Sequence, residues 1–233
     1  MNKLIFVSGW GTESSVWDSV ACEFGESVSF IPWWECLSDG PHNNSLLKIL
    51  ADSDDSVILV GWSLGGMIAL SATINCPERV SGLVLISSSA RMVRDKGYSG
   101  INPRILKAMK FRLKSDKQQL LTDFANMGTS PATNDSIKID FVNNALNING
   151  DKLSSGLSFL QNYDLRSELE SVSVPVNIIH GKHDQIMNPA NADYLAEYLS
   201  NAKLDIVAYG GHFLIQEHPK LIIESIIDLM IKV

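Results

Sequence analysis

The sequence lacks the features that mark several specialised classes of protein. Cysteine is scarce, and its three positions form no C-x-x-C pair, which argues against a disulfide framework and against a zinc knuckle. We interpret Cys22, Cys36 and Cys76 as buried or partly buried free thiols. No run of about 18 apolar residues occurs, so no transmembrane helix is predicted. No period of about 20 to 50 residues repeats, which argues against a solenoid.

The sequence also lacks a recognisable leader and an excess of positive charge. The N-terminal residues have neither the length nor the small-residue cleavage site of a signal peptide, so we expect a cytoplasmic protein. The net charge of −7 argues against binding to nucleic acid. What is present is a globular composition, with 45% apolar and 19% charged residues among 233. We expect a monomer with a substantial core and no membrane span.

Positive charge is concentrated in one segment of the chain. Residues 91–117 contain nine basic and two acidic residues, a net charge of +7. The remaining ten basic and 24 acidic residues leave the rest of the chain at −14. This asymmetry has two interpretations, a solvated helix face or a surface that attracts an acidic partner.

Short apolar runs recur along the chain and predict the strands of one sheet. Each run is continuous rather than alternating, as in strands that are buried on both faces of a parallel sheet. The runs are residues 4–7, 28–31, 57–60, 83–86, 176–179 and 204–207. Helical patterns lie between them at residues 64–75, 189–200 and 218–231. This alternation predicts an α/β fold with a mostly parallel, doubly wound sheet.

One region interrupts the alternation of strands and helices. It contains no predicted strand and has the pattern of four helices, at residues 103–113, 116–127, 134–146 and 152–161. We therefore predict an α/β core from residues 1–88 and 167–233, with residues 89–166 inserted as a helical cap, or lid. The basic segment falls in the first half of this cap.

Ser63 lies in a motif with a specific chemical use. The segment Gly61-Trp62-Ser63-Leu64-Gly65 follows a predicted strand and precedes a predicted helix, which is the context that G-x-S-x-G requires. The turn is so sharp that side chains at the two glycine positions would clash, and it lifts the serine Oγ above the edge of the sheet. The start of the following helix favours a developing oxyanion. Ser63 is therefore the predicted nucleophile.

A serine hydroxyl needs a base, and the base needs an orienting group. The chain has five histidines, which are His42, His180, His183, His212 and His218. We predict His212 as the base, because it follows the last predicted strand after two glycines and precedes the terminal helix. Asp184 is the predicted orienting acid, since it follows the strand at 176–179 and completes the chain order serine, acid, histidine. No ligand cluster accompanies His180 and His183, so no metal is predicted, and no organic cofactor is required.

An oxyanion formed at the serine needs two backbone N–H donors. We predict that they come from Leu64, which follows the nucleophile, and from Trp10, in the loop after the first strand. Gly9 and Gly11 flank Trp10 and would let the backbone approach the substrate closely. A plain glycine turn is the alternative interpretation of this loop.

Several apolar side chains are candidates for contact with an acyl chain. The predicted substrate-binding residues are Trp10, Trp62, Phe111, Phe124 and Phe159. The alternative is that most of these side chains form the core of the cap.

The chain resembles the α/β-hydrolase superfamily along essentially its whole length. The serine motif and the chain order of nucleophile, acid and base carry the resemblance. The chain departs from the family pattern in two places. Ser8 stands where members usually carry the histidine of His-Gly-x-Gly, and Pro32-Trp33-Trp34 stands where they often carry Asp-x-x-Gly-x-Gly. Because the donor in the first loop is a backbone amide, we expect the oxyanion hole to survive the change at Ser8.

A narrower resemblance is to the pimeloyl-[acyl-carrier-protein] methyl ester esterases of biotin synthesis. The segments that carry it are Gly9-Trp10-Gly11, Val16-Trp17, Gly61 to Gly66, Pro77-Glu78-Arg79-Val80, Gly100-Ile101-Asn102-Pro103, Gly156-Leu157 and Asp164-Leu165-Arg166. The resemblance implies hydrolysis of a methyl ester on an acyl chain that is held by acyl carrier protein. It also implies that basic cap residues bind the acidic carrier, for which Arg104, Lys107 and Arg112 are the candidates.

Other functions could use the same three residues. A general short-chain carboxylesterase, a thioesterase or a carbon–carbon bond hydrolase would need the same triad but no carrier. A catalytically silent hydrolase fold that binds a ligand is the alternative from another class of protein. Ser63 in place of an aspartate argues against a haloalkane dehalogenase.

Overall fold

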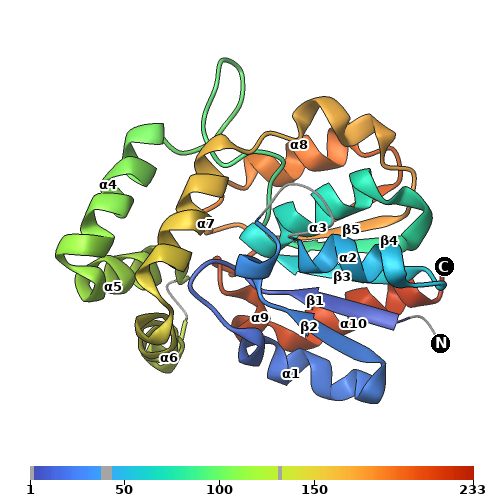
Figure 1. The fold of residues 1–233 in the computed structure, drawn as a ribbon, viewed down its shortest axis with the longest axis horizontal. Helices are drawn as coiled ribbons and strands as arrows, with labels where there is room; N and C mark the ends of the chain where they lie inside the picture. The colour runs from blue at the N-terminus through green and yellow to red at the C-terminus, as the bar shows by residue number, and fades with distance from the viewer. Residues whose placement is uncertain (1–2, 38–43, 131–132) are drawn as a thin grey trace.

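A six-stranded sheet forms the centre of the molecule. The computed structural model describes residues 3–37, 44–130 and 133–233. The strands are β1 (Lys3–Val7), β2 (Val28–Ile31), β3 (Val57–Trp62), β4 (Val80–Ile86), β5 (Val176–Gly181) and β6 (Ala202–Val207). They are ordered β2-β1-β3-β4-β5-β6, and every neighbouring pair is parallel (Figure 1). The predicted α/β fold with a parallel sheet is confirmed.

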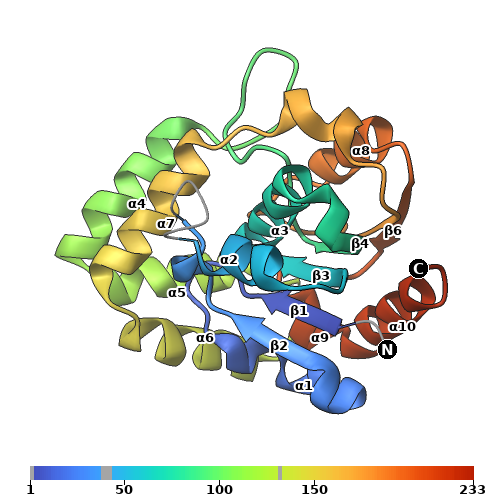
Figure 2. The same cartoon turned by 45° about the vertical axis from the view of Figure 1, so that its right-hand side comes forward.

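Helices cover both faces of the sheet, as Figures 1 and 2 show. One face is covered by α1 (Asp18–Ala21), α9 (Leu214–Glu217) and α10 (Pro219–Met230), and the other by α2 (Ser45–Asp52), α3 (Leu64–Asn75) and α8 (Ala190–Tyr198). The central strands β3 and β5 are consequently buried along their whole length. Strands β2 and β6 are the edges of the sheet and are only partly buried, so the prediction of burial on both faces is wrong for these two runs.

Helix α2 is missing from the sequence predictions, although its local signals are present. Leu46 and Leu50 are one turn apart and both are buried. The side chain of Asn44 accepts a hydrogen bond from the N–H of Leu47 at 3.1 Å, which caps the start of the helix. A capping residue followed by an apolar pair at this spacing would have been enough to predict the helix.

Four helices lie between β4 and β5 in the chain. They are α4 (Pro103–Ser115), α5 (Lys117–Gly128), α6 (Asp135–Asn147) and α7 (Gly150–Asn162), and their ends differ from the predicted ones by at most two residues. Each begins where a side chain accepts a backbone N–H of the first turn, and these capping residues are Asn102, Asp116, Asn134 and Asn149. Helix α4 packs on α7, and α5 packs on α6. We keep the name cap for the predicted insertion at residues 89–166, whose helices α4 to α7 lie together at one end of the sheet (Figure 2).

The described residues contain no helix with both the length and the apolar character needed to cross a membrane.

Candidate active site

Ser63 occupies the tight turn between β3 and α3. Its backbone has φ 56° and ψ −119°, a conformation that non-glycine residues rarely adopt. The two glycines of the motif are required by space, because a Cβ at Gly61 would lie 2.5 Å from the carbonyl oxygen of Gly65. A Cβ at Gly65 would lie 2.2 Å from the carbonyl oxygen of Val7. The turn that the sequence motif predicts therefore forms, with Ser63 at the carboxyl end of a central strand.

The structure brings Ser63, His212 and Asp184 into one chain of hydrogen bonds. The Ser63 Oγ lies 2.9 Å from His212 Nε2, and His212 Nδ1 lies 2.7 Å from Asp184 Oδ2. Because a carboxylate oxygen only accepts, the proton of the neutral imidazole is on Nδ1, and Nε2 is free to accept from the serine hydroxyl. The other carboxylate oxygen, Oδ1, accepts the N–H groups of Ile186 and Met187, both at 2.8 Å. Asp184 is thus held at both oxygens, and all three side chains are buried.

Trp62 supports the histidine but does not line a substrate cavity. Its indole Nε1 donates to the backbone oxygen of His212 at 2.8 Å, and its rings lie 5.5 Å from the imidazole. The side chain is almost completely buried. The prediction that Trp62 binds substrate is therefore wrong, because its side chain points into the core beneath His212.

His180 is a second buried histidine, and it lies beside the carboxylate of Asp184. Its Nε2 lies 2.9 Å from the carbonyl oxygen of Met187 and 3.4 Å from Asp184 Oδ2. Since a carbonyl only accepts, Nε2 must carry the proton. Burial lowers the pKa of His180 and keeps the ring neutral, against the opposing charge of Asp184. Among the described residues its Nδ1 has no hydrogen-bond partner.

His183 and His218 belong to no metal site in the part of the chain that the structure describes. His183 is exposed, and His218 precedes Pro219 at the start of α10. No group of three or more potential ligands for a metal ion occurs within residues 3–37, 44–130 and 133–233. His42 lies outside the described residues.

The two predicted oxyanion donors lie beside the nucleophile. Leu64 is the first residue of α3, so its N–H has no partner within the helix. The loop that carries Trp10 packs closely on the turn, because a Cβ at Gly9 would lie 3.2 Å from the Cβ of Ser63. The Trp10 side chain is fixed by a 2.9 Å bond from its Nε1 to the carbonyl of Leu153 in α7.

Ser8 stabilises the same loop in place of the histidine that is usual in the family. Its hydroxyl donates to the carbonyl oxygen of Thr12 at 3.3 Å. The Thr12 hydroxyl in turn donates to the carbonyl oxygen of Gly9 at 2.8 Å. These two bonds close the turn from within, and the backbone of Trp10 lies inside it.

Ser63 opens into an apolar cavity of about 140 Å³ beneath the cap. Its walls come from α4, α5, α7 and the segment that follows Asp184, and they include Met109, Leu120, Phe124, Leu157 and Met187. Trp10 also lines the cavity, with its ring centroid 5.0 Å from that of Phe124. Two of the predicted substrate-binding residues, Trp10 and Phe124, therefore lie where a substrate on Ser63 would extend.

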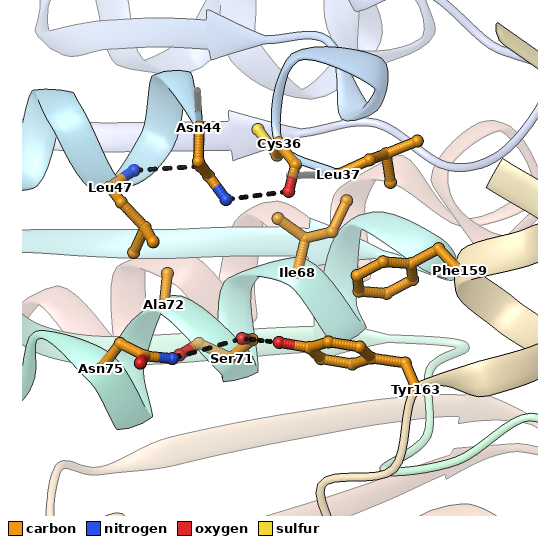
Figure 3. Close-up of a pocket in the computed structure, with 10 residues that line it drawn as sticks. All are labelled: Cys36, Leu37, Asn44, Leu47, Ile68, Ser71, Ala72, Asn75, Phe159 and Tyr163. Atoms are coloured by element: carbon orange, nitrogen blue, oxygen red, sulfur yellow. Dashed lines mark hydrogen bonds between the residues drawn. The ribbon is translucent and has the colours of Figure 1, made fainter. Parts of the chain in front are cut away.

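Phe111 and Phe159, which were also predicted to bind substrate, do not line the cavity at Ser63. Phe111 is 72% exposed, because two residues along a helix turn it about 200° away from its neighbours Met109 and Leu113, which face inward. Phe159 stacks on Tyr163 with ring centroids 4.0 Å apart. Both of these rings line a second cavity of about 120 Å³ between α2, α3 and α7 (Figure 3).

The second cavity holds one of the three thiols. Burial raises the pKa of Cys36 to about 12, so this thiol stays protonated and unreactive. Ser71 and Tyr163 meet across the cavity wall with their hydroxyl oxygens 2.6 Å apart (Figure 3). Cys76 is partly buried, whereas Cys22 is exposed, which corrects the prediction that all three cysteines are at least partly buried.

The three predicted carrier-binding residues do not form one uniform surface. Arg104 and Lys107 are exposed on α4. Arg112 is paired with Asp123 at 2.6 Å, and this pair forms part of the wall of the cavity at Ser63. Other residues of the basic segment also have partners inside the protein, since Arg91 pairs with Asp164 and Lys117 binds two carbonyl oxygens of the cap.

A serine, a histidine and an aspartate joined in this order at the carboxyl end of a parallel sheet, beneath a helical insertion, define an α/β hydrolase. Residues 32–219 match the family described as alpha/beta hydrolase fold. The chain belongs to this family, and it is a hydrolase.

Curated relatives and solved structures agree with this assignment. The chain is 30% identical over 233 residues to the pimeloyl-[acyl-carrier protein] methyl ester esterase of Wigglesworthia glossinidia brevipalpis, covering 94% of this chain and 90% of the relative. It is 29% identical over 224 residues to the protein of the same name from Nitrosomonas europaea, covering 90% and 88%. Among solved structures, an esterase from Exiguobacterium antarcticum superposes with a TM-score of 0.86 at 20% identity, over 98% of this chain and 91% of that one. The resemblance to the α/β-hydrolase superfamily is confirmed.

Proposed function

We propose that this protein is a serine esterase that hydrolyses the methyl ester of an acyl chain held on acyl carrier protein. The observation that carries the proposal is the continuous hydrogen-bonded chain Asp184–His212–Ser63, which opens into an apolar cavity under the cap. The names of the curated relatives support the choice of substrate.

The proposed reaction begins with attack of the Ser63 Oγ on the ester carbonyl. His212 Nε2 takes the hydroxyl proton, while Asp184 stabilises the imidazolium and keeps the ring in its orientation. The backbone N–H groups of Trp10 and Leu64 hold the oxyanion. His212 then gives its proton to the leaving methoxide, and methanol departs. Water repeats the same steps on the acyl-enzyme and releases the carboxylate.

The cavity supports an extended acyl chain as substrate. Its walls are almost entirely apolar, which suits a run of methylene groups that leaves water on binding. The Arg112–Asp123 ion pair is the main charged part of its wall among the described residues. We assign to this pair the binding of the polar part of the substrate, which links the acyl chain to the carrier.

The exposed basic residues of α4 support an acidic partner. Arg104 and Lys107 are on the cap, while the rest of the chain outside residues 91–117 has a net charge of −14. A basic patch on an otherwise acidic protein raises the rate at which an acidic carrier meets that part of the surface.

The test compares two kinds of ester on the wild type and on Ser63→Ala. We expect hydrolysis of pimeloyl-carrier methyl ester to exceed that of p-nitrophenyl acetate and butyrate in kcat/KM, and both to be lost in Ser63→Ala. Turnover of only the small esters would contradict the carrier substrate and would indicate a general carboxylesterase. Absence of turnover together with no labelling of Ser63 by a fluorophosphonate would indicate a fold that binds without catalysis.

A further inference from the structure

Glu217, the last residue of α9, lies between the loop that carries His212 and the segment that follows α5. Its Oε2 accepts the N–H of Gly211, the residue before the base, at 2.8 Å. Its Oε1 accepts the hydroxyl of Thr133 and, at 3.4 Å, the N–H of Ser130. One carboxylate therefore bridges the base loop of the core and a segment of the cap.

A direct backbone contact runs alongside this bridge. The N–H of His212 donates to the carbonyl oxygen of Gly128, the last residue of α5, at 2.6 Å. The two segments are packed without room for side chains, because a Cβ at Gly211 would lie 2.6 Å from the nitrogen of Ser130. A Cβ at Gly128 would lie 2.5 Å from the ring of Phe213. The end of α5 is therefore in direct backbone contact with the loop that carries His212, which we call the base loop.

Helix α5 also forms a wall of the cavity at Ser63. Leu120, Phe124 and Met127 from this helix line the cavity. The Phe124 ring centroid lies 6.3 Å from that of His212. A substrate that displaces α5 would thus act on the same helix whose end is bonded to the base loop.

We propose that Glu217 is a positioning residue that couples the cap helix α5 to the catalytic base. Within the described residues Glu217 has no hydrogen bond to Ser63 or Asp184, and it acts through Gly211 and His212. Its hydrogen-bond partners among the described residues are neutral N–H and O–H donors, so the carboxylate acts there as an acceptor at both oxygens and not as half of an ion pair. The inference rests on the proposed role of Ser63 and His212.

The kinetic test uses Glu217→Ala and Glu217→Gln, with Glu224→Ala as a control because Glu224 is exposed on the neighbouring helix α10. Glutamine can still accept the N–H of Gly211 through its oxygen, while its NH₂ group can donate to the Thr133 hydroxyl and gives up only the long bond from the Ser130 N–H. We expect Glu217→Ala to lower kcat on p-nitrophenyl acetate about tenfold to a hundredfold with little change in KM, since small displacements of a base have effects of this size. We expect Glu217→Gln to recover most of that loss. An unchanged kcat in Glu217→Ala, or an equal loss in Glu224→Ala, would overturn the proposal.

The coupling to the cap is tested from the other side with Thr133→Val, which removes the hydroxyl bond to Glu217 and the 3.1 Å contact with the Ser130 hydroxyl. Its loss of kcat should be smaller than that of Glu217→Ala, and the double variant should match Glu217→Ala alone. Losses that multiply would show that Thr133 and Glu217 act separately and would overturn the coupling.

Amide hydrogen exchange gives a readout that does not depend on catalysis. Exchange at Gly211 and His212 should become faster in Thr133→Val, although that substitution lies on the cap side, and should be unchanged in Glu224→Ala. Unaltered exchange in Thr133→Val would overturn the coupling. If the wild type hydrolyses no ester and Ser63 resists the fluorophosphonate, the proposed function fails, and the exchange result still decides whether the cap and the base loop are coupled.

Discussion

At the scale of single residues, Asp184 is the acceptor for three N–H groups at once. Its Oδ1 accepts from the backbone of Ile186 and Met187, and its Oδ2 accepts from His212. In Asp184→Asn the new NH₂ group must face either the backbone donors or the imidazole, and the second arrangement favours the wrong tautomer of His212. We expect kcat on p-nitrophenyl acetate to fall by roughly 10³- to 10⁴-fold with KM within about twofold. An Asp184→Asn variant within about tenfold of the wild type would contradict the proposed role of Asp184.

The buried His180 predicts a dependence of stability on pH. Burial lowers its pKa in the folded protein, and the titratable groups that act on it are Asp184 and Asp193, which raise the pKa, and His212, which lowers it when protonated. Below the ordinary histidine pKa of about 6.5, the unfolded chain therefore binds a proton that the folded chain does not bind. The free energy of unfolding should fall as the pH drops below that value, and it should fall less in His180→Gln, whose side-chain nitrogen can still donate to Met187. Urea unfolding at pH 7 and pH 5 measures the fall in the free energy of unfolding for the wild type and for His180→Gln. An equal fall in the two proteins would refute this account.

The residues of the site differ in how far local sequence could predict them. Ser63, Asp184 and His212 each follow a strand, and glycines beside Ser63 and His212 mark sharp turns, so local pattern and chain order were sufficient to select them. Trp62 and His180 could not be assigned in that way. The bond from Trp62 to the backbone of His212 joins residues 150 positions apart, and only the assembled fold brings them into contact.

At the scale of elements, helix α7 offers a matched pair of glycines. A Cβ at Gly156 would lie 2.6 Å from the Trp33 ring and 2.7 Å from the Trp10 ring, whereas a Cβ at Gly150 would meet nothing within 4 Å. Overpacking of this kind costs about 1–3 kcal/mol and outweighs the gain of up to about 1 kcal/mol from alanine in a helix. We expect Gly156→Ala to lower the free energy of unfolding and also kcat, because Trp10 belongs to the predicted oxyanion loop.

Gly150→Ala is the control, and it should leave kcat unchanged and keep or raise stability. Urea unfolding and p-nitrophenyl acetate hydrolysis measure both variants. Equal effects at the two glycines would show that the close contact with Trp10 and Trp33 has no consequence.

Apolar periodicity predicted the helices of the cap to within two residues but did not predict which aromatic rings face the cavity. The positions of Met109 and Phe111 differ by only two residues, yet one lines the cavity and the other is exposed. Which side of a helix is buried depends on the element that it packs against. Helix α4 packs on α7, which lies about 40 residues further along the chain. A count of aromatic residues in the cap therefore overestimates the number that can contact substrate.

At the scale of the whole molecule, the sheet assembles the site from segments that are far apart in the chain. Ser63 and His212 are 149 positions apart, and they meet because β3 and the segment after β6 reach the same edge of a parallel sheet.

The distribution of charge is a second property of the whole molecule. Several of the nine basic residues between 91 and 117 are used in bonds within the protein, which the sequence alone could not reveal. The basic surface available to a partner is consequently smaller than the composition indicates.

Arg104 and Lys107 remain as exposed basic residues of α4, so the carrier hypothesis is tested on them and not on the paired Arg112. We expect the double variant Arg104→Glu, Lys107→Glu to lower kcat/KM for pimeloyl-carrier methyl ester by about tenfold or more at low salt, since steering by charge changes association rates by such factors. Hydrolysis of p-nitrophenyl acetate should not change, because the cavity is untouched.

The matched control is Lys48→Glu, Lys220→Glu, which makes the same change in net charge at exposed positions of α2 and α10, outside the cap. At about 1 M salt, where the Debye length is about 3 Å, the difference between the two double variants should disappear. An equal loss on the carrier ester and the small ester, or an equal loss in the control, would assign the basic residues of α4 to a solvated helix face. The hydrolase would then act on its ester without electrostatic guidance from the cap.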